Sequence, residues 1–372
     1  MSEPIRVLHV FHYLNRGGAE TFIMNVYRNI DRSKVQFDFM LHTTEKCSYD
    51  DEVAELGGKI FRVPSYTVAN HMNYKAEWQD FFCNNKTHRI IHGHMTSTAA
   101  IYLKIAKGYG LITVAHAHTT SSGKGFSAVV KYILQIQLKY ITDILYACSR
   151  EAGEWCYGKN ISSKPNFRII KNAIDIEAYL FSDETRKRIR EELGIEGRFV
   201  VGHVGRFSKP KNHEFLIEIF SEIHQRNKDT VLLLVGDGDL RATIESKVIK
   251  LGLNDCVVFT GVRSDIPDLL FSMDVFLFPS LWEGLPVTLI EAQTSSLNCI
   301  ISDCITSEVQ ITDMVTTISL NEPAVRWAEK VLSFLNAPRR INMKKEIKNA
   351  GFDIRDISEW LQNSYIGAIK NE

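Results

Sequence analysis

The sequence predicts an α/β protein made of two doubly wound, Rossmann-like domains. Apolar runs of strand length alternate with helical stretches, and each half opens with a strand, a glycine-containing turn and a helix, at about 5–30 and 199–226. The 372 residues, of which 45% are apolar, suffice for two hydrophobic cores. The linker is expected at about 172–185, which gives domains of 1–175 and 176–354.

Charge and cysteine content restrict the class of protein. Lys plus Arg and Asp plus Glu number 44 each, so nothing indicates a nucleic-acid-binding surface. The seven scattered cysteines form no CxxC pair, so we expect neither a zinc site nor a disulfide framework. No leader pattern opens the chain, and no apolar run approaches the roughly 20 residues of a membrane span. We therefore expect a cytoplasmic protein.

In the first half, strands are expected at 5–11, 37–42, 59–63, 89–93 and 111–115, with helices at 50–56, 77–84 and 97–107 between them. Gly17 and Gly18 follow the first strand and permit close approach of the backbone to a ligand. An ordinary tight turn is the alternative, because the pair is not a GxGxxG motif.

A histidine pair, His116 and His118, is expected just after the strand 111–115. Open α/β sheets bind ligands at the carboxyl ends of their strands, so either ring could bind a donor. The alternative, that the histidines have no role at the ligand site, is equally open. A metal site is not expected, because acidic or sulfur ligands are missing nearby. The apolar stretch 125–146 carries interspersed lysines, and a packed helix is favoured over a membrane-surface helix there.

In the second half, Arg206 and Lys211 lie in one loop after the strand 199–204. An arginine fork and a lysine point charge together match a diphosphate, although solvated surface cations are the alternative. Gly236 follows the strand 231–235 and could let a phosphate or ribose approach, or could simply form a turn. Val262 and Arg263 follow the strand 257–260, where backbone groups would border a nucleobase.

The stretch 279–292, PSLWEGLPVTLIEA, is the most informative of the chain. It follows an apolar strand at 274–278, so Glu283 is expected in the loop and Glu291 one to two turns inside a helix that begins at Pro286. Helix-end amides near Val287 favour bound anions, and two carboxylates suit hydroxyls; together they describe a nucleotide sugar. The alternative is that both glutamates are solvated acids. The turn residues of this candidate donor site are Gly284, Leu285, Pro286 and Val287.

Six motifs, in this order along nearly the whole chain, resemble glycosyltransferase family 4, retaining enzymes of the GT-B fold. They are GGAE, HAH, VGRFSKPKNH, LLLVGDGDL, FTGVRSDIPDLLFSMDVFLFPSLWEGLPVTLIEA and IISDCITSE. The glutamate pair with seven residues between is the most specific feature, and SDCITSEVQIT resembles bacterial capsular or exopolysaccharide transferases. Residues 295–298 depart from the family, which commonly has glycine and proline there.

The resemblance implies two Rossmann-like domains facing across a cleft, an N-terminal one for the acceptor and a C-terminal one for the donor. A last helix at about 355–372 would return to the first domain. Arg206 and Lys211 would hold the donor diphosphate, Glu291 the ribose and Glu283 the sugar hydroxyls. His116 or His118 would contact the donor sugar, and Gly17 and Gly18 would border the phosphates.

The function expected is transfer of a sugar, with retention, from a nucleotide sugar, with UDP as the expected carrier, to a saccharide or lipid-linked acceptor. Cations and helix amides would stabilise the departing diphosphate, so neither a cofactor nor a catalytic metal is expected. A glycosidase would leave the phosphate-binding loop unexplained. A GT-B-like sugar-nucleotide epimerase and a non-catalytic partner subunit are the remaining alternatives.

Overall fold

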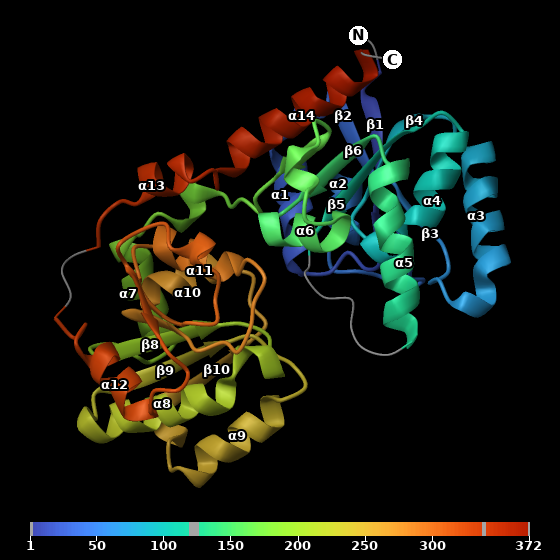
Figure 1. Cartoon of the computed structure of the whole chain (residues 1–372). Coiled ribbons are helices and arrows are strands. Elements are labelled where there is room, and N and C mark those ends of the chain that lie inside the picture. Colours follow the sequence, from blue (N-terminus) through green and yellow to red (C-terminus); the bar gives the residue numbers. More distant parts are fainter. Residues whose placement is uncertain (1–2, 119–125, 337–339, 371–372) are drawn as a thin grey trace. The chain divides into compact units, whose positions relative to one another are not determined.

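The computed structural model describes residues 3–118, 126–336 and 340–370, with the backbone alone for 126–133. The chain divides into two compact units, shown in Figure 1. Unit 1 holds residues 1–173 and 353–372, and unit 2 holds residues 174–352. Residues 175 and 355, where the sequence places the domain boundary and the returning helix, each lie two residues from these divisions.

Unit 1 contains a seven-stranded sheet in the order β3-β2-β1-β4-β5-β6-β7. Its strands pair in parallel, and continuous apolar runs fit strands that are covered on both faces. The order reverses between β1 and β4, which makes their carboxyl ends the switch point of this sheet. The strands are β1 Ile5–Phe11, β2 Val35–Leu41, β3 Ile60–Arg62, β4 His88–Gly93, β5 Ile112–Ala117, β6 Ile144–Ala147 and β7 Phe167–Ile169.

Helices cover both faces of this sheet, and the last helix of the chain belongs to it. Figure 1 shows α14, in red, lying along the blue first elements of the chain. Its residues Ile354, Leu361 and Tyr365 are buried with α1, β1 and β2 in one hydrophobic cluster. The helices of unit 1 are α1 Gly18–Asn29, α2 Asp50–Glu55, α3 His71–Asn84, α4 Thr96–Gly108, α5 Phe126–Ile141, α6 Arg150–Tyr157 and α14 Ile354–Lys370.

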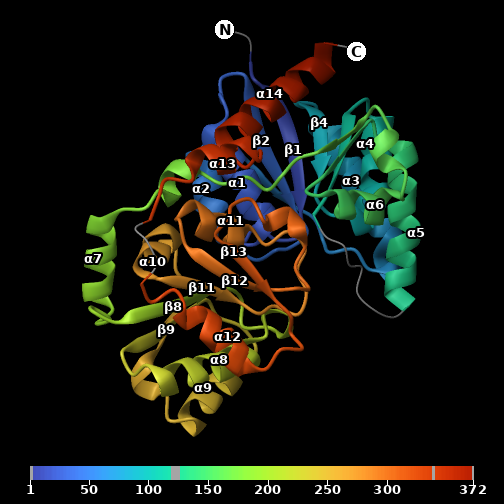
Figure 2. The same ribbon diagram turned by 60° about the vertical axis from the view of Figure 1, so that its left-hand side comes forward.

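Unit 2 repeats the same plan with six parallel strands in the order β10-β9-β8-β11-β12-β13. The switch point therefore lies between β8 and β11, and Figure 2 shows this sheet with its helices. The strands are β8 Phe199–Val204, β9 Thr230–Val235, β10 Val257–Gly261, β11 Val275–Phe278, β12 Asn298–Ser302 and β13 Val315–Ile318. The α-helices are α7 Asp183–Glu192, α8 His213–Arg226, α9 Arg241–Lys250, α10 Ile266–Ser272, α11 Val287–Thr294, α12 Ala324–Leu332 and α13 Lys344–Asn349.

Several boundaries differ from the sequence-based expectation, and burial and strand pairing explain the differences at α3 and β5. Helix α3 begins at His71, six residues before the expected 77, because Tyr74 continues the buried stripe of Trp78 and Phe81. Strand β5 reaches Ala117 instead of ending at 115, because His116 and Ala117 still pair with β6. Among the described residues, no helix is long and apolar enough to cross a bilayer.

Candidate active site

The switch point of unit 2 brings together two of the expected site residues, Lys211 and Glu283. Lys211 ends the short 3₁₀ helix η4, Lys209–Lys211, after β8, and Glu283 lies in the loop after β11. Lys211 Nζ lies 2.8 Å from Glu283 Oε1, and the two side chains are only 17% and 13% exposed. The ammonium also lies 4.5 Å from the centre of the Phe278 ring. Lys211 is thus held at the carboxyl edge of the sheet by a partly buried ion pair.

Hydrogen bonds to backbone carbonyls fix the two loops against each other. Leu281 donates its amide to the Pro210 carbonyl at 2.8 Å, and Asn212 Nδ2 donates to the Pro279 carbonyl at 3.0 Å. Asn212 adopts a left-handed φ of +56°, a conformation that asparagine tolerates better than most residues. This turn ends η4 and starts α8, so it sets the position of Lys211. The sequence offered no signal for Asn212 beyond its place after Lys211.

Arg206 lies in the same loop but extends to solvent. Its side chain is 69% exposed, and its guanidinium meets Asp239 only at 3.5 Å, also on the surface. Such a contact contributes little to stability. Arg206 is therefore available to a ligand. Lys211 would have to give up part of its contact with Glu283 to bind the same ligand.

Glu291 lies in the second turn of α11, as expected, and is partly buried. Tyr179 donates its hydroxyl to Glu291 Oε1 at 2.8 Å, and desolvation by the surrounding protein raises the pKa of the carboxyl to about 7. Because Tyr179 contacts Oε1, the Oε2 atom of Glu291 could contact a ligand, and a carboxyl group suits a pair of hydroxyl groups. Tyr179 was not expected in the site, because it comes from η3, Ile176–Tyr179, within the linker.

Helix α11 begins one residue later than the sequence predicted. Pro286 is its N-cap, with an extended ψ of 101°, and Val287 is the first helical residue. The expectation of Pro286 as the first helical residue was therefore wrong, although the proline still ends the loop. Gly284 is exposed, while Leu285 and Val287 pack partly against the core of unit 2. The first-turn amides of α11 thus lie beside the loop that carries Glu283.

Gly236 serves the packing of two loops, and its expected role as a bare backbone for a ligand stays a prediction. Its φ is +130°, and a Cβ there would lie 2.2 Å from the Gly205 carbonyl oxygen. The space that a side chain would need is filled by the loop that carries Arg206. Gly236 therefore brings the loops after β8 and β9 together.

Two further expected residues follow β10. The Val262 side chain is exposed, as a residue at the edge of a base-binding site would be. Arg263 is engaged by acids of its own unit, with its guanidinium 2.6 Å from Asp265 and 3.2 Å from Glu192. Those carboxylates raise the pKa of Arg263 further above its usual range. Arg263 is therefore a structural cation in this loop, and its backbone is what remains for a ligand.

In unit 1, the glycine pair opens α1. Gly17 is the N-cap, and a Cβ on it would lie 2.3 Å from Glu20 Oε2, while a Cβ on Gly18 would meet open space. The Glu20 carboxylate thus folds over the helix start at Gly17, and a side chain at that position would displace it. Gly18 leaves the surface of this helix end open.

The two expected histidines occupy different environments. His116 is a residue of β5 and is fully buried, so its expected place in a loop after the strand was wrong. His118 follows the strand and is partly exposed, with its ring 4.0 Å from that of His116. Burial lowers the pKa of His118 to about 3, so its ring is neutral at physiological pH. Of the two, His118 is the one that a ligand can reach.

His94 was missed, although it directly contacts His118. His94 Nδ1 lies 2.8 Å from His118 Nε2, and His9 Nδ1 lies 3.0 Å from His94 Nε2. A repeated sequence pattern could have revealed the contact between His94 and His118. HGH at 92–94 lies at the end of β4 and HAH at 116–118 at the end of β5, and these are neighbouring parallel strands. Parallel neighbours bring such motifs to one edge of a sheet.

Solved structures with the same architecture are glycosyltransferases of the GT-B fold. The structure of HepE from Anabaena in complex with UDP superposes with a TM-score of 0.77 at 17% identity, covering 98% of this chain and all of that one. Residues 185–353 match the family described as "Glycosyl transferases group 1".

Relatives extend this match to the whole chain. "Putative glycosyltransferase EpsF" of Bacillus subtilis is 36% identical, over 98% of this chain and 97% of its own length. The chain belongs to the group 1 glycosyl transferases and is a glycosyltransferase. A galactosyltransferase of Escherichia coli, named for UDP-Gal and α-D-GlcNAc-diphosphoundecaprenol, is 27% identical over 76% of both chains. Capsular polysaccharide biosynthesis glycosyltransferase CapH of Staphylococcus aureus is 24% identical over 97% of this chain and 99% of its own.

These matches favour neither the epimerase nor the non-catalytic subunit. The finer assignment to family 4 stays a prediction.

Proposed function

We propose that this glycosyltransferase moves a sugar from a UDP-sugar to a saccharide or lipid-linked saccharide acceptor in capsule or exopolysaccharide synthesis. The names of the E. coli and S. aureus relatives support the donor, the lipid-linked acceptor and the pathway class. The observation that carries the proposal is the Lys211–Glu283 pair at the switch point of unit 2. Open α/β sheets bind nucleotides at this position.

The donor would be held by charge and hydroxyl contacts from separate loops. Arg206 and Lys211 would bind the diphosphate together with the first amides of α11, a helix end that favours anions. Glu291 would accept hydrogen bonds from the ribose hydroxyls, and Glu283 from those of the sugar. The backbone beyond β10, at Val262 and Arg263, would border the base.

In the transfer step, the bond from the anomeric carbon to the diphosphate oxygen breaks, and the electron pair leaves with the diphosphate. A bond forms from the acceptor oxygen to the anomeric carbon, and the acceptor proton passes to the departing phosphate oxygen. Arg206 and Lys211 lower the energy of the charge that develops there. Attack from the face that the diphosphate leaves would retain the anomeric configuration.

The chain's own cations take the role that a divalent metal takes in other transferases. We therefore expect that adding Mg²⁺ or Mn²⁺ to the chelator-treated enzyme does not raise kcat. A several-fold rise would contradict this part of the proposal.

A peripheral contact with the inner face of the membrane completes the proposal, through α5 of unit 1. Tyr140 on this helix is 73% exposed, and Lys139 and Lys164 lie 5.0 and 5.7 Å from its ring. An exposed aromatic ring flanked by lysines suits an anionic headgroup layer. We expect the wild-type chain to co-sediment with anionic vesicles and not with zwitterionic ones, and Tyr140→Ala to lose this binding. Equal co-sedimentation of the wild-type chain and Tyr140→Ala with anionic vesicles would overturn the proposed contact.

The experiment for the donor is a thermal-shift panel of UDP- and GDP-sugars, since a ligand of the native state raises the midpoint of unfolding. We expect UDP and one or more UDP-sugars to raise it, and GDP-sugars to leave it unchanged. The sugar that gives the largest shift is then tested for transfer to a diphospholipid-linked saccharide. A shift with GDP compounds alone would contradict the choice of nucleotide.

A further inference from the structure

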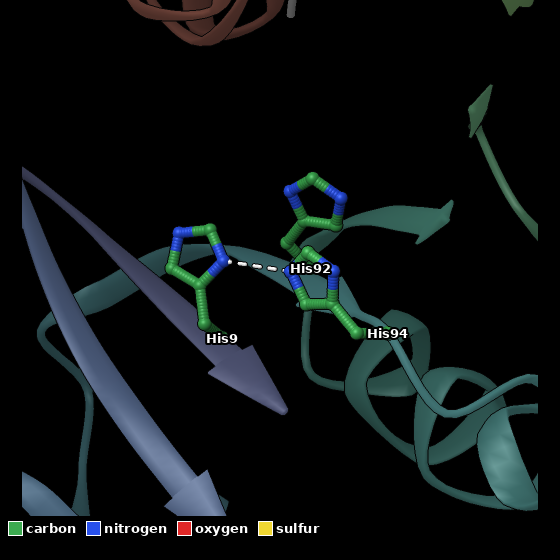
Figure 3. Close-up of side chains that lie close together, drawn as sticks. All are labelled: His9, His92 and His94. Carbon is green, nitrogen blue, oxygen red and sulfur yellow. Dashed lines mark hydrogen bonds between the residues drawn. The ribbon is translucent and has the colours of Figure 1, made fainter. Parts of the chain in front are cut away.

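Three buried histidines of unit 1 meet in one cluster, which we call the β1/β4 histidine cluster: His9, His92 and His94 (Figure 3). His9 on β1 and His92 on β4 are register partners on neighbouring strands. His94 follows two residues after His92 and so points to the same side of the sheet. One ring nitrogen from each of the three lies within 4.8 Å of the other two.

Outer hydrogen bonds orient two of these rings. His92 Nδ1 lies 2.6 Å from the Tyr365 hydroxyl on α14, and His94 Nδ1 lies 2.8 Å from His118 Nε2. When each Nδ1–H is donated outward, the lone pair of each Nε2 is left for the interior of the cluster. Metal-binding histidines typically have this arrangement, in which the other ring N–H is held by a fixed acceptor.

The cluster is buried and contains an unpaired ligand nitrogen. His9 and His92 are fully buried and His94 nearly so. Among the described residues, Nε2 of His92, the atom that would bind the metal, has no hydrogen-bond partner. Buried polar atoms are nearly always paired, so this nitrogen requires an explanation. Burial also favours the neutral imidazole, which is the form that binds a metal.

We propose that His9, His92 and His94 bind one divalent transition-metal ion, with Zn²⁺ as the expected species, in a structural site of unit 1. Three imidazoles suit zinc, copper or nickel, whereas Mg²⁺ and Ca²⁺ need oxygen ligands. Zinc–nitrogen bonds of about 2.0–2.1 Å place two tetrahedral ligand nitrogens about 3.3 Å apart. The separation between His9 Nδ1 and His94 Nε2 is 3.0 Å, so this pair needs little movement.

The site would join parts of the chain that are far apart in sequence. It would tie β1 to β4 and, through the bond of His92 to Tyr365, tie both strands to α14. A second possible group, His94 with His116 and His118, shares one residue with this cluster. It uses His118, which a ligand can reach, so we assign the metal to the group that lies wholly in the interior. The assignment does not depend on the donor site of unit 2.

The first test uses the full chain, stripped with a strong chelator under mild denaturation and refolded. Zn²⁺ is expected to bind at one equivalent and to raise the midpoint of thermal unfolding by several degrees, because the ion binds only the native site. Co²⁺ in its place is expected to give the visible absorption bands of a tetrahedral nitrogen site. Two results together would overturn the proposal: less than about 0.1 equivalent of Zn²⁺ bound, and a midpoint of thermal unfolding equal to that of a control without metal.

The second test asks which histidines are ligands. His92→Phe and His9→Phe keep a flat ring but remove the nitrogens, and each should abolish Co²⁺ absorption. His213→Phe is the matched control, because His213 is also buried and stacks 4.2 Å from Phe207, but lies in unit 2. The His213→Phe variant should still bind one equivalent of Co²⁺. Loss of cobalt binding in His118→Ala, with binding kept in His9→Phe, would move the metal to the other histidines and contradict the assignment. If neither phenylalanine variant folds, the cobalt spectrum of the unmodified chain still decides.

Discussion

Lys211 Nζ lies 2.8 Å from Glu283 Oε1, and this ion pair joins the loops that follow β8 and β11. Each side chain holds the other at the switch point of unit 2 before any donor binds. In the proposed donor site, an entering diphosphate would compete with Glu283 for the lysine, and the carboxylate would then be free to accept hydrogen bonds from sugar hydroxyls. The pair would therefore couple the two halves of donor recognition.

Removing either member of this pair should reduce both activity and stability. Lys211→Met and Glu283→Gln are each expected to lower kcat/KM by at least about 100-fold, which corresponds to one lost charge-stabilising group in the transition state. Each should destabilise the fold by about 1–3 kcal/mol, because the remaining charge is partly buried without its partner. Steady-state kinetics and urea unfolding measure the two effects.

The double variant separates the pair from its neighbours. Because both changes remove the same contact, its loss of stability should be smaller than the sum of the single losses. Strict additivity would mean that the 2.8 Å contact contributes nothing, and that the hydrogen bonds to Pro210 and Pro279 hold the loops together.

Arg206→Ala should affect the donor without affecting the fold. The side chain is exposed and its contact with Asp239 is long, so the free energy of unfolding should change by less than about 0.5 kcal/mol. A charge-assisted bond to phosphate is worth about 1.5–3 kcal/mol, so the donor KM should rise about 10- to 100-fold. Arg226→Ala, on the exposed side of α8 beside Glu222, is the control and should leave KM unchanged.

Glu291 should make stability fall as pH rises. Its pKa is about 7 in the folded state against 4.5 ordinarily, so between these values the native state holds a proton that the unfolded chain has lost. The free energy of unfolding then decreases from pH 4.5 to 7, by about 3 kcal/mol at most. Glu291→Gln should remove this slope, and the difference between the two profiles cancels the contribution of the histidines. Parallel profiles would place the carboxyl at its ordinary pKa.

Gly236→Ala should be strongly destabilising, because the new methyl group meets the Gly205 carbonyl and φ is +130°. A loss of more than about 2 kcal/mol in the free energy of unfolding is expected. Gly284→Ala is the control: its Cβ would meet no described atom within 4 Å, so the midpoint of unfolding should stay nearly unchanged. Equal losses in the free energy of unfolding for Gly236→Ala and Gly284→Ala would mean that the contact with Gly205 does not require glycine at position 236.

Local sequence signals predicted the elements well where periodicity and turn residues agree. The strand before Glu283 and the helix around Glu291 were expected from pattern alone, and the last helix, expected at about 355–372 from the family resemblance, lies at 354–370. The glutamate spacing also indicated a glycosyltransferase, which the match of residues 185–353 to the group 1 glycosyl transferases and the EpsF relative confirm, whereas family 4 itself stays a prediction. These features are local, so a single stretch of chain contains the information.

Contacts between distant residues were not predictable in the same way. Tyr179 reaches Glu291 across 112 positions, and the interior position of His116 depends on where β5 ends. The role of Gly236 against Gly205 follows from how two loops pack, which no spacing encodes. The β1/β4 histidine cluster likewise combines position 9 with positions 92 and 94, and only the strand order 2-1-4 brings them together.

We propose that Arg206, Lys211, Glu283 and Glu291 form one nucleotide-sugar site in unit 2. Isothermal titration of UDP into the wild-type enzyme and into the Arg206→Ala, Lys211→Met double variant measures the contribution of the two cations to this site. We predict micromolar binding by the wild-type enzyme and an affinity lower by about 1,000-fold in the folded double variant, two lost charge-assisted contacts to phosphate. An unchanged affinity for UDP in that variant would mean that Arg206 and Lys211 do not bind the diphosphate.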